Sequence, residues 1–305
     1  MNVLYWFESI RNTEGTGLLT RFFEFITFFG HELIPIALIC VLYWCADKKL
    51  AYKIGFSFFL SGLMTQCLKV TFRVERPWIK DPAFTPVEGA VNEATSYSFP
   101  SGHTQAATSV YGSLALTLKK HWLRIVCVLL FVIVGISRLY LGVHTPLDVG
   151  VSMALTFVIT LIVFSFFEKL YDNRKADIWV SLVMVAISLF TLIYTSVLFG
   201  NGKINYKAAS DCIKSGGAGL AFAIGYFIER RYIDFDTKAK NIWMQIVKLA
   251  AGLGIALGLK EGLKVIFKLI LGPENLWADG IRYFVLVAVI IVIYPWIIKK
   301  LSQRN

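Results

Sequence analysis

The sequence predicts an all-α protein, a polytopic integral membrane bundle of roughly nine spans with an interfacial helical segment at its N-terminus. Composition is the first observation behind this. Hydrophobic residues fill 56% of the 305 positions and charged residues only 17%, which is more apolar than a soluble globular chain. The second observation is that apolar residues gather into runs of about 18 or more, the length a helix needs to cross a hydrocarbon layer of about 30 Å.

Residues 1–29, at the N-terminus, form the first predicted element. Val3, Leu4, Phe7 and Ile10 recur at helical spacing, and no basic stretch precedes an apolar one as it would in a cleavable signal peptide. We therefore expect a segment that lies at the membrane interface. The spans that follow are predicted at residues 31–46, which is slightly short, and at 51–69, 102–118, 122–141, 147–168, 178–198, 208–228, 242–259 and 281–298.

The distribution of basic residues predicts the orientation of these spans, because cytoplasmic loops accumulate Lys and Arg. Alternate loops carry most of the positive charge, so we place them in the cytoplasm, and the net charge of +11 indicates topology and contact with anionic lipid headgroups rather than nucleic-acid binding. The basic residues of these loops are Lys48, Lys49, Lys53, Lys119, Lys120, Arg124, Lys169, Arg174, Lys175, Arg230, Arg231, Lys238, Lys240, Lys299, Lys300 and Arg304.

Three polar strings interrupt the apolar sequence on the opposite, extracytoplasmic side. The first runs from Lys69 to Pro77. Lys69 and Arg76 are seven residues apart, so they would share one helix face if the second span continued that far, with Pro77 ending the helix. Such a pair recruits an anion, although basic residues at the end of a span are also typical of snorkelling anchors.

The second string, Pro100-Ser101-Gly102-His103, lies where a loop becomes the third span. Ser101 or Gly102 would occupy the N-cap region, where free backbone N–H groups bind phosphate oxygens, and His103 in the first turn would reach the same ligand. By itself this string could be no more than a helix cap.

The third string contains Arg138, His144 and Asp148 and brackets the turn between the fourth and fifth spans. Pro146 suits the first turn of the following helix. If that helix begins near residue 145, Asp148 meets His144, fixes its tautomer and leaves the other ring nitrogen free to attack. Two histidines that share nucleophilic and acid–base work beside fixed positive charge indicate a phosphate-handling site.

The three strings together, Lys-x6-Arg-Pro, Pro-Ser-Gly-His and Ser-Arg-x5-His-x3-Asp, resemble the three-part signature of the type 2 phosphatidic acid phosphatase family at every position. The resemblance implies that His144 is the nucleophile, that Asp148 orients it, and that His103 protonates the leaving group. It also implies a phosphohistidine intermediate that needs neither metal nor cofactor. The groups that would hold the phosphate oxygens are Lys69, Arg76, Ser101, Gly102 and Arg138.

The resemblance divides the chain into an interfacial segment at 1–29, a catalytic membrane core at 30–175 and additional transmembrane helices at 176–305. Glycines in the third part remove side-chain bulk where helices approach closely. Gly216, Gly217 and Gly219 do so in one span, and Gly252, Gly254 and Gly258 in another. They would pack these helices within the chain or pair two copies in a homodimer, and we favour packing within the chain.

A site at the outer ends of spans suits a membrane lipid whose phosphate stands at headgroup level. The expected substrates are undecaprenyl pyrophosphate, phosphatidylglycerol phosphate, phosphatidic acid or a sphingoid-base phosphate, hydrolysed by a multi-pass protein of the cell membrane. Two alternatives stay open: a phosphatase of soluble esters similar to glucose-6-phosphatase, and a lipid transporter or scramblase on a degenerate phosphatase core. The filled signature argues against the transporter, and no convincing repeat relates the two halves of the chain.

Overall fold

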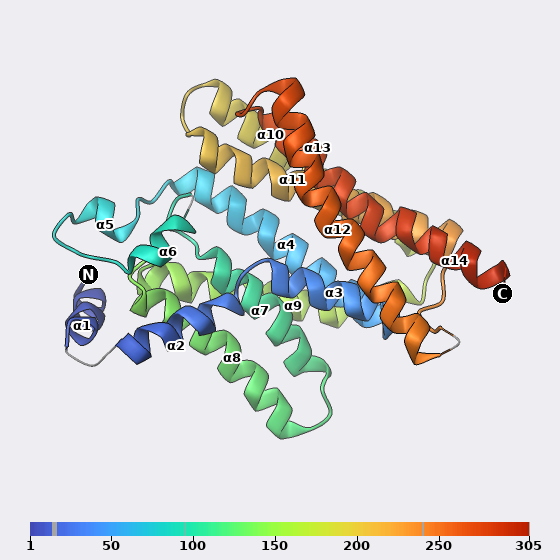
Figure 1. Cartoon of the computed structure of the whole chain (residues 1–305), viewed down its shortest axis with the longest axis horizontal. Helices are drawn as coiled ribbons and strands as arrows, with labels where there is room; N and C mark the ends of the chain where they lie inside the picture. Colours follow the sequence, from blue (N-terminus) through green and yellow to red (C-terminus); the bar gives the residue numbers. More distant parts are fainter. Residues whose placement is uncertain (14–16, 95, 240, 305) are drawn as a thin grey trace. The chain divides into compact units, whose positions relative to one another are not determined.

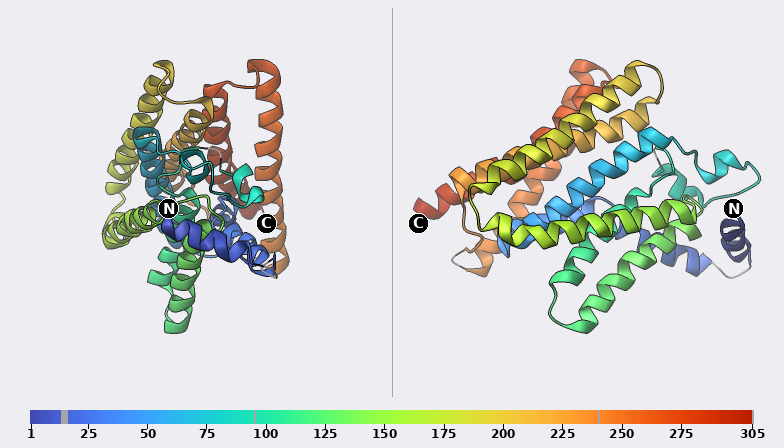
Figure 2. Two further views of the ribbon diagram at one scale, coloured as in Figure 1. Left: turned by 90° about the vertical axis from the view of Figure 1, so that its left-hand side faces the viewer. Right: turned by 180° about the vertical axis from the view of Figure 1, so that it is seen from behind.

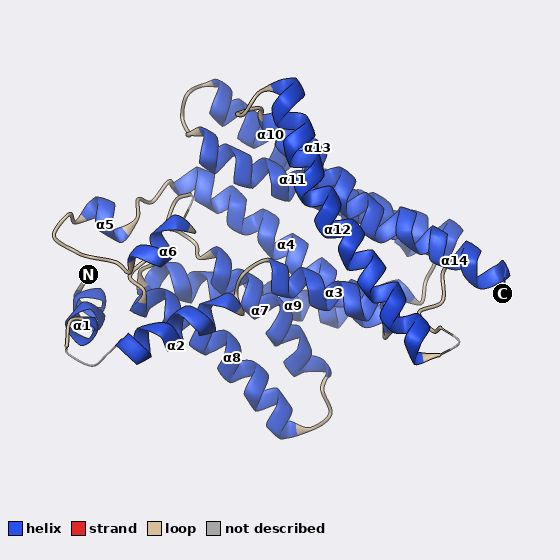
Figure 3. Ribbon diagram, viewed as in Figure 1, coloured by secondary structure: helices blue, strands red, loops and turns tan. Residues whose placement is uncertain are grey.

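A computed structural model describes residues 1–13, 17–94, 96–239 and 241–304. Within them every regular element is a helix, which confirms the predicted all-α fold (Figure 3). The elements, labelled in Figure 1, are α1 (Asn2–Arg11), α2 (Gly17–Phe28), α3 (Leu33–Cys45), α4 (Lys48–Phe72), α5 (Pro77–Lys80), α6 (Glu88–Asn92), α7 (Gly102–Thr117), α8 (His121–Tyr140), α9 (Pro146–Tyr171), α10 (Ala176–Gly200), α11 (Tyr206–Ile228), the π-helix η1 (Glu229–Ile233), α12 (Ile242–Leu271), α13 (Leu276–Ala288), the π-helix η2 (Val289–Ile293) and α14 (Tyr294–Arg304).

The count of nine spans is too high. Among the described residues, six helices are long and apolar enough to cross a membrane, or seven if α2 and α3, bent by 43°, form one broken span. The 16 residues of α7 make it shorter than the others, and α11 carries Asp211, Lys214 and several glycines, which lower its hydropathy. The protein is therefore a multi-pass membrane protein with six or seven spans by length and composition. The remaining helices where spans were expected are α7, α11 and, if it does not form a span with α2, α3.

The described chain forms two compact units, and neither is one continuous stretch of sequence. Unit 1 comprises residues 1–35 and 64–162, and unit 2 comprises residues 36–63 and 163–305. Helices α4 and α9 contribute to both units. Each unit is described by itself below.

In unit 1 the N-terminal helices α1 and α2 pack against α8. Arg11 of α1 donates hydrogen bonds to the carbonyl oxygens of Tyr140 and Thr85. Phe23 of α2 stacks on the Tyr140 ring with 4.3 Å between ring centroids. The N-terminal segment is thus joined by hydrogen bonds and aromatic contacts to the end of α8, where the third polar string begins.

In unit 2, α10, α11 and α13 run side by side (Figures 1 and 2). Glycine permits this approach: a Cβ on Gly217 would lie 2.3 Å from the backbone oxygen of Gly280, and one on Gly216 would lie 2.7 Å from Leu192 Cδ2. The prediction that glycines pack helices within the chain is confirmed for these two positions, and for Gly219 and Gly252.

The same prediction is wrong for the other two glycines of α12. A Cβ on Gly254 or Gly258 would meet no described atom within 4 Å. These glycines point away from the neighbouring helices of unit 2, because Gly252, which does touch Trp44 and Tyr294, lies on a different face of the same helix. Pairing with a second copy stays a prediction for the face that carries Gly254 and Gly258.

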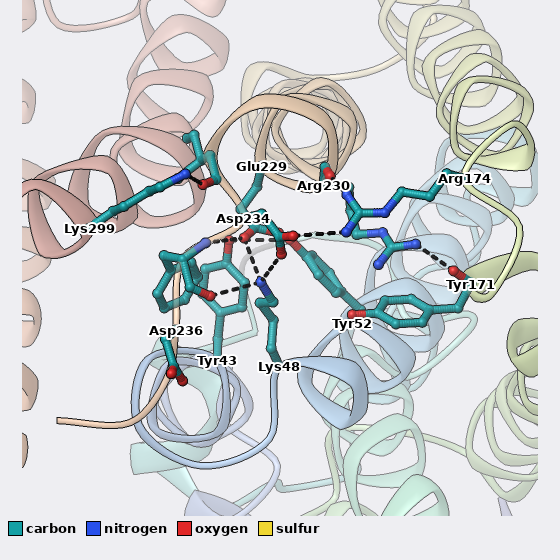
Figure 4. Close-up of polar contacts among 12 residues, drawn as sticks. Tyr43, Lys48, Tyr52, Tyr171, Arg174, Glu229, Arg230, Asp234, Asp236 and Lys299 are labelled. Atoms are coloured by element: carbon teal, nitrogen blue, oxygen red, sulfur yellow. Dashed lines mark hydrogen bonds and ion pairs between the residues drawn. The ribbon is translucent and has the colours of Figure 1, made fainter. Parts of the chain in front are cut away.

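A cluster of charged residues around the buried Glu229 joins the ends of several helices in unit 2 (Figure 4). Glu229, which is fully buried at the start of η1, accepts hydrogen bonds from Lys48 Nζ at 2.8 Å and from the Tyr52 hydroxyl. Lys48 also pairs with Asp234 at 3.0 Å, and Arg174 pairs with the other oxygen of Asp234 at 2.8 Å. We call Lys48, Tyr52, Arg174, Glu229 and Asp234 the charge clasp. It ties α4, the α9–α10 loop and the end of α11 together.

Replacing Glu229 by alanine is expected to destabilise the protein markedly. The change leaves the Lys48 ammonium, whose side chain is 13% exposed, without one of its two carboxylate partners, and it leaves the buried Tyr52 hydroxyl without its carboxylate acceptor. A buried donor left unpaired costs about 1–3 kcal/mol. Thermal unfolding in detergent measures the effect as a lower midpoint. Asp236→Ala removes an exposed carboxylate from the same segment and should leave the midpoint close to that of the wild type. Equal midpoints for the two variants would contradict a stabilising role for the clasp.

Candidate functional site

The first polar string adopts a conformation that the sequence did not predict. Helix α4 ends at Phe72, four residues earlier than expected, and Arg73 has a φ of 51°. A residue in this left-handed region cannot continue a right-handed helix. Pro77 does not end α4 but begins the short helix α5, with Arg76 as its N-cap residue. Lys69 and Arg76 therefore do not share a helix face, and the expected two-turn spacing is wrong.

Both basic side chains nevertheless turn toward the other strings. Lys69 Nζ donates a 2.7 Å hydrogen bond to the Tyr97 carbonyl, and Arg76 Nε donates one of 2.8 Å to the Ser96 carbonyl. Arg76 Nη1 also reaches the Val143 carbonyl at 2.9 Å. These bonds tie the loop just before the second string, and the turn before His144, to the first string, so that Arg76 links the first string to the third and to the loop that leads into the second.

The second string forms the helix N-terminus that was predicted for it. Ser101 is the N-cap residue of α7, and its hydroxyl accepts from the Thr104 N–H. Its own N–H donates to the Asp148 carbonyl at 3.1 Å, which holds the start of α7 against α9. A Cβ built on Gly102 would meet no described atom within 4 Å, so the first turn of α7 is open where an anion would approach.

The third string brings a histidine and a carboxylate together, as the four-residue spacing predicted. Helix α9 begins at Pro146, and His144 Nδ1 lies 3.6 Å from Asp148 Oδ2. The same carboxylate oxygen accepts from the Ser98 hydroxyl at 2.6 Å and from the Thr145 N–H at 2.7 Å. On the other side of the ring, His144 Nε2 lies 3.0 Å from Arg76 Nη1. Since Arg76 can only donate, Nε2 is the acceptor and Nδ1 carries the proton that faces Asp148.

Burial decides the protonation state of His144, whose residue is 1% exposed. Loss of solvation holds the pKa of the His144 imidazole well below its usual range, and the neighbouring positive charge of Arg76 lowers this pKa further. Asp148 acts in the opposite direction without reversing the shift. His144 is therefore neutral at physiological pH, with a lone pair on Nε2, which is the form that a nucleophile needs.

Arg138 connects this group to His103. Its charge acts on both imidazoles, and the residue is 1% exposed. Arg138 Nε and His103 Nε2 are buried atoms with no hydrogen-bond partner among the described residues. Buried donors are rarely left unpaired, so these two atoms mark the place where a ligand with several acceptor oxygens would fit.

Sequence reasoning missed three residues of this site. Ser98 donates to Asp148, Thr27 accepts from Arg138 Nη1 at 2.6 Å, and Glu93 Oε2 lies 3.6 Å from His103 Nε2. The His103 imidazole beside it lowers the pKa of the Glu93 carboxyl. Only Ser98, three residues before Ser101, lies close enough to a string to be suspected. Nothing in the local sequence of Thr27 or Glu93 marks either residue.

Comparison with known families agrees with this arrangement. The family profile described as "PAP2 superfamily" matches residues 50–172, which include all three strings. A second profile, "PAP2 superfamily phosphatase, transmembrane extension", matches residues 213–305. The chain belongs to the PAP2 superfamily. Residues 213–305 of this PAP2 protein, from within α11 to the C-terminus, match the transmembrane extension that the second profile describes, whereas α10 lies outside that match.

Several relatives of known activity resemble this PAP2 chain over part of its length. Phosphatidylglycerophosphatase B of Bacillus subtilis is 38% identical over 34% of this chain and 54% of its own length. An undecaprenyl-diphosphatase of Sulfolobus acidocaldarius is 29% identical over 41% and 59%, and human sphingosine-1-phosphate phosphatase 2 is 29% identical over 68% and 51%. The chain thus spans less than two thirds of each of these relatives. No solved structure matches the chain.

Proposed function

We propose that this PAP2 protein is a membrane phosphatase that hydrolyses a lipid phosphate or pyrophosphate monoester at the extracytoplasmic face. The proposal rests on the position of His144. This neutral, buried imidazole has Arg76 beside its Nε2 and Asp148 beside its Nδ1. This geometry is that of an activated nucleophile whose attacking nitrogen already lies beside a phosphate-binding cation. The names of the three relatives, all of them lipid phosphatases, support the same class of substrate.

The reaction follows from the positions of these groups. A phosphate oxygen takes over the Arg76 Nη1 hydrogen bond, which frees the Nε2 lone pair of His144 to attack phosphorus. The bond from phosphorus to the leaving oxygen, which is the lipid oxygen of a monoester or the bridging oxygen of a pyrophosphate, breaks as the new N–P bond forms. Burial and the charge of Arg138 lower the pKa of His103 to about 3, so His103 takes up a proton as the phosphate dianion binds beside it and then gives that proton to the departing oxygen. Water then attacks the phosphohistidine and releases inorganic phosphate, with His103 taking a proton from that water.

Fixed positive charge lowers the barrier of both steps. Lys69, Arg76 and Arg138 are buried side chains, so their charges act on the transferring phosphoryl group with little screening by water. Ser101 and the Gly102 N–H at the start of α7 add donors to the same oxygens. If α7 and α11 also cross the membrane, as the sequence predicts, the loops that carry most Lys and Arg lie on the side opposite the site, which supports an extracytoplasmic site. We also propose that the protein lies in the cell membrane. Its proposed parts are an interfacial segment at residues 1–29, a catalytic membrane core at 30–175 and additional transmembrane helices at 176–305.

A substrate panel tests the proposal. Protein purified in detergent with EDTA should release phosphate from one or more of undecaprenyl pyrophosphate, phosphatidylglycerol phosphate, phosphatidic acid and a sphingoid-base phosphate, and much more slowly from glucose 6-phosphate. Metal independence predicts the same rate after Mg²⁺ is added. Release from glucose 6-phosphate alone would contradict the lipid substrate class, and release from none of the five would contradict the enzyme.

A further inference from the structure

We infer that Thr27, in the N-terminal helix α2, is a positioning residue that holds Arg138 in place for the substrate phosphate. The inference rests on the proposed function and adds to it a residue outside the three polar strings. Arg138 Nη1 donates a 2.6 Å hydrogen bond to Thr27 Oγ1. It is the hydrogen bond by which the Arg138 side chain is held among the described residues. Arg138 Nε has no hydrogen-bond partner among them.

Burial makes this single bond important. Arg138 is 1% exposed and Thr27 is 8% exposed, so water does not compete for the guanidinium from the side of α2. A hydrogen bond from a charged donor is worth more than one between neutral groups, and a buried donor left unpaired costs more still. The Thr27 oxygen therefore selects one orientation of the guanidinium plane. In that orientation the Nε hydrogen is not used by the protein and is available to an oxyanion.

The end of α2 cannot shift to follow the arginine. A Cβ on Gly30, one turn beyond Thr27, would lie 2.7 Å from Val134 Cγ1 of α8 and 2.8 Å from the His103 carbonyl of α7. The Tyr111 hydroxyl of α7 donates to the carbonyl of Phe29 at 3.1 Å. The chain from Thr27 to Gly30 is thus packed between α7, which carries His103 in its first turn, and α8, which carries Arg138. A rigid support of this kind preorganises a phosphate-binding group.

Three variants separate positioning from general support of the fold. Thr27→Val keeps the shape of the side chain and removes the acceptor, whereas Thr27→Ser keeps the acceptor. Thr20→Val is the matched control: Thr20 is also on α2, but its hydroxyl pairs with the Tyr140 hydroxyl at 3.0 Å rather than with Arg138. Thr27→Ser should unfold at a temperature close to that of the wild type. Thr27→Val and Thr20→Val each remove one hydrogen bond, so both should lower the unfolding temperature modestly, and this common effect on stability is what the control measures.

The three variants should differ in kcat. Thr27→Val is expected to lower kcat about tenfold, equivalent to about 1.4 kcal/mol of transition-state stabilisation, with a smaller change in KM because charge on the phosphoryl oxygens grows toward the transition state. Thr27→Ser should restore most of the loss, and Thr20→Val should retain wild-type kcat. A wild-type kcat in Thr27→Val, or equal losses in Thr27→Val and Thr20→Val, would overturn the inference.

A double-mutant cycle with Arg138→Lys identifies the partner through which Thr27 acts. If Thr27 acts by orienting the guanidinium, Thr27→Val should cause little further loss once that group is absent. Full additivity would overturn the inference. Binding of inorganic phosphate, measured by calorimetry, keeps this test independent of turnover. Should the wild type hydrolyse no lipid phosphate, the proposed function fails, yet weaker phosphate binding by Thr27→Val than by Thr20→Val still supports the role of Thr27, and equal binding overturns it.

Discussion

Replacing His144 by alanine is expected to lower phosphate release by about 10⁴-fold or more, the scale on which a hydrolase loses activity with its nucleophile. In the unaltered protein Nε2 of His144 lies 3.0 Å from Arg76 Nη1, and the carboxylate of Asp148 lies on the opposite side of the ring. No other described nucleophile occupies this position between the cation and the carboxylate. The rate should be measured with the preferred lipid of the substrate panel.

Two controls make the result specific to the intermediate. His121→Ala removes an exposed histidine at the start of α8, at the end of that helix opposite Arg138, and should keep wild-type activity. Rapid quenching of the wild type with ³²P-labelled substrate should trap label on the protein that is stable to base and labile to acid, as a phosphohistidine is. Retention of more than a trace of turnover by His144→Ala, or base-stable label on that variant, would exclude His144 as the nucleophile.

The sequence predicted the local structure of the second and third strings because short-range rules govern them. Ser101 caps α7 because a hydroxyl before a helix satisfies a free N–H, and α9 begins at Pro146 because proline fits the first helical turn. The approach of Asp148 to His144 followed directly from that start, since residues four apart lie on one side of a helix.

The prediction for the first string was wrong because contacts between distant parts of the chain, rather than short-range rules, determine its conformation. Nothing in the local sequence around Arg73 marks a non-glycine residue with positive φ, and such a conformation is stable only when tertiary contacts compensate for its cost. The Ser98 N–H donates to the Val74 carbonyl at 2.7 Å, and Arg76 donates to the Ser96 carbonyl. These bonds join residues 20 or more positions apart, which no helical periodicity describes.

Glycine packing shows the same limit in the membrane helices. Spacing identified close-approach glycines in both α11 and α12, and Gly217 does pack against the Gly280 backbone. Gly258 has the same spacing from Gly254 as a packing pair but faces no described neighbour. In an apolar span every face is hydrophobic, so the sequence cannot distinguish a protein-facing side of the helix from a lipid-facing one.

Replacing His103 by alanine is expected to lower the hydrolysis of an alkyl lipid phosphate by about 10²–10⁴-fold, the usual contribution of a positioned general acid. His103 lies in the first turn of α7, and its Nε2 has no hydrogen-bond partner among the described residues. An alkoxide is a poor leaving group and needs this proton, whereas an aryl oxide leaves with little assistance. The loss should therefore be much smaller with an aryl phosphate such as p-nitrophenyl phosphate.

The comparison of the two substrates, rather than the loss of activity on either one, tests whether His103 is the general acid. A change that merely disturbs phosphate binding slows both substrates by the same factor, because both present the same phosphoryl group. His31→Ala provides the matched control: the His31 ring centroid lies 6.1 Å from that of His103, so the variant removes a neighbouring imidazole without removing the proposed acid. It should leave the ratio of alkyl to aryl rates unchanged. Equal losses on the two substrates in His103→Ala would assign His103 to phosphate binding, and proton transfer to the leaving oxygen would then need another donor.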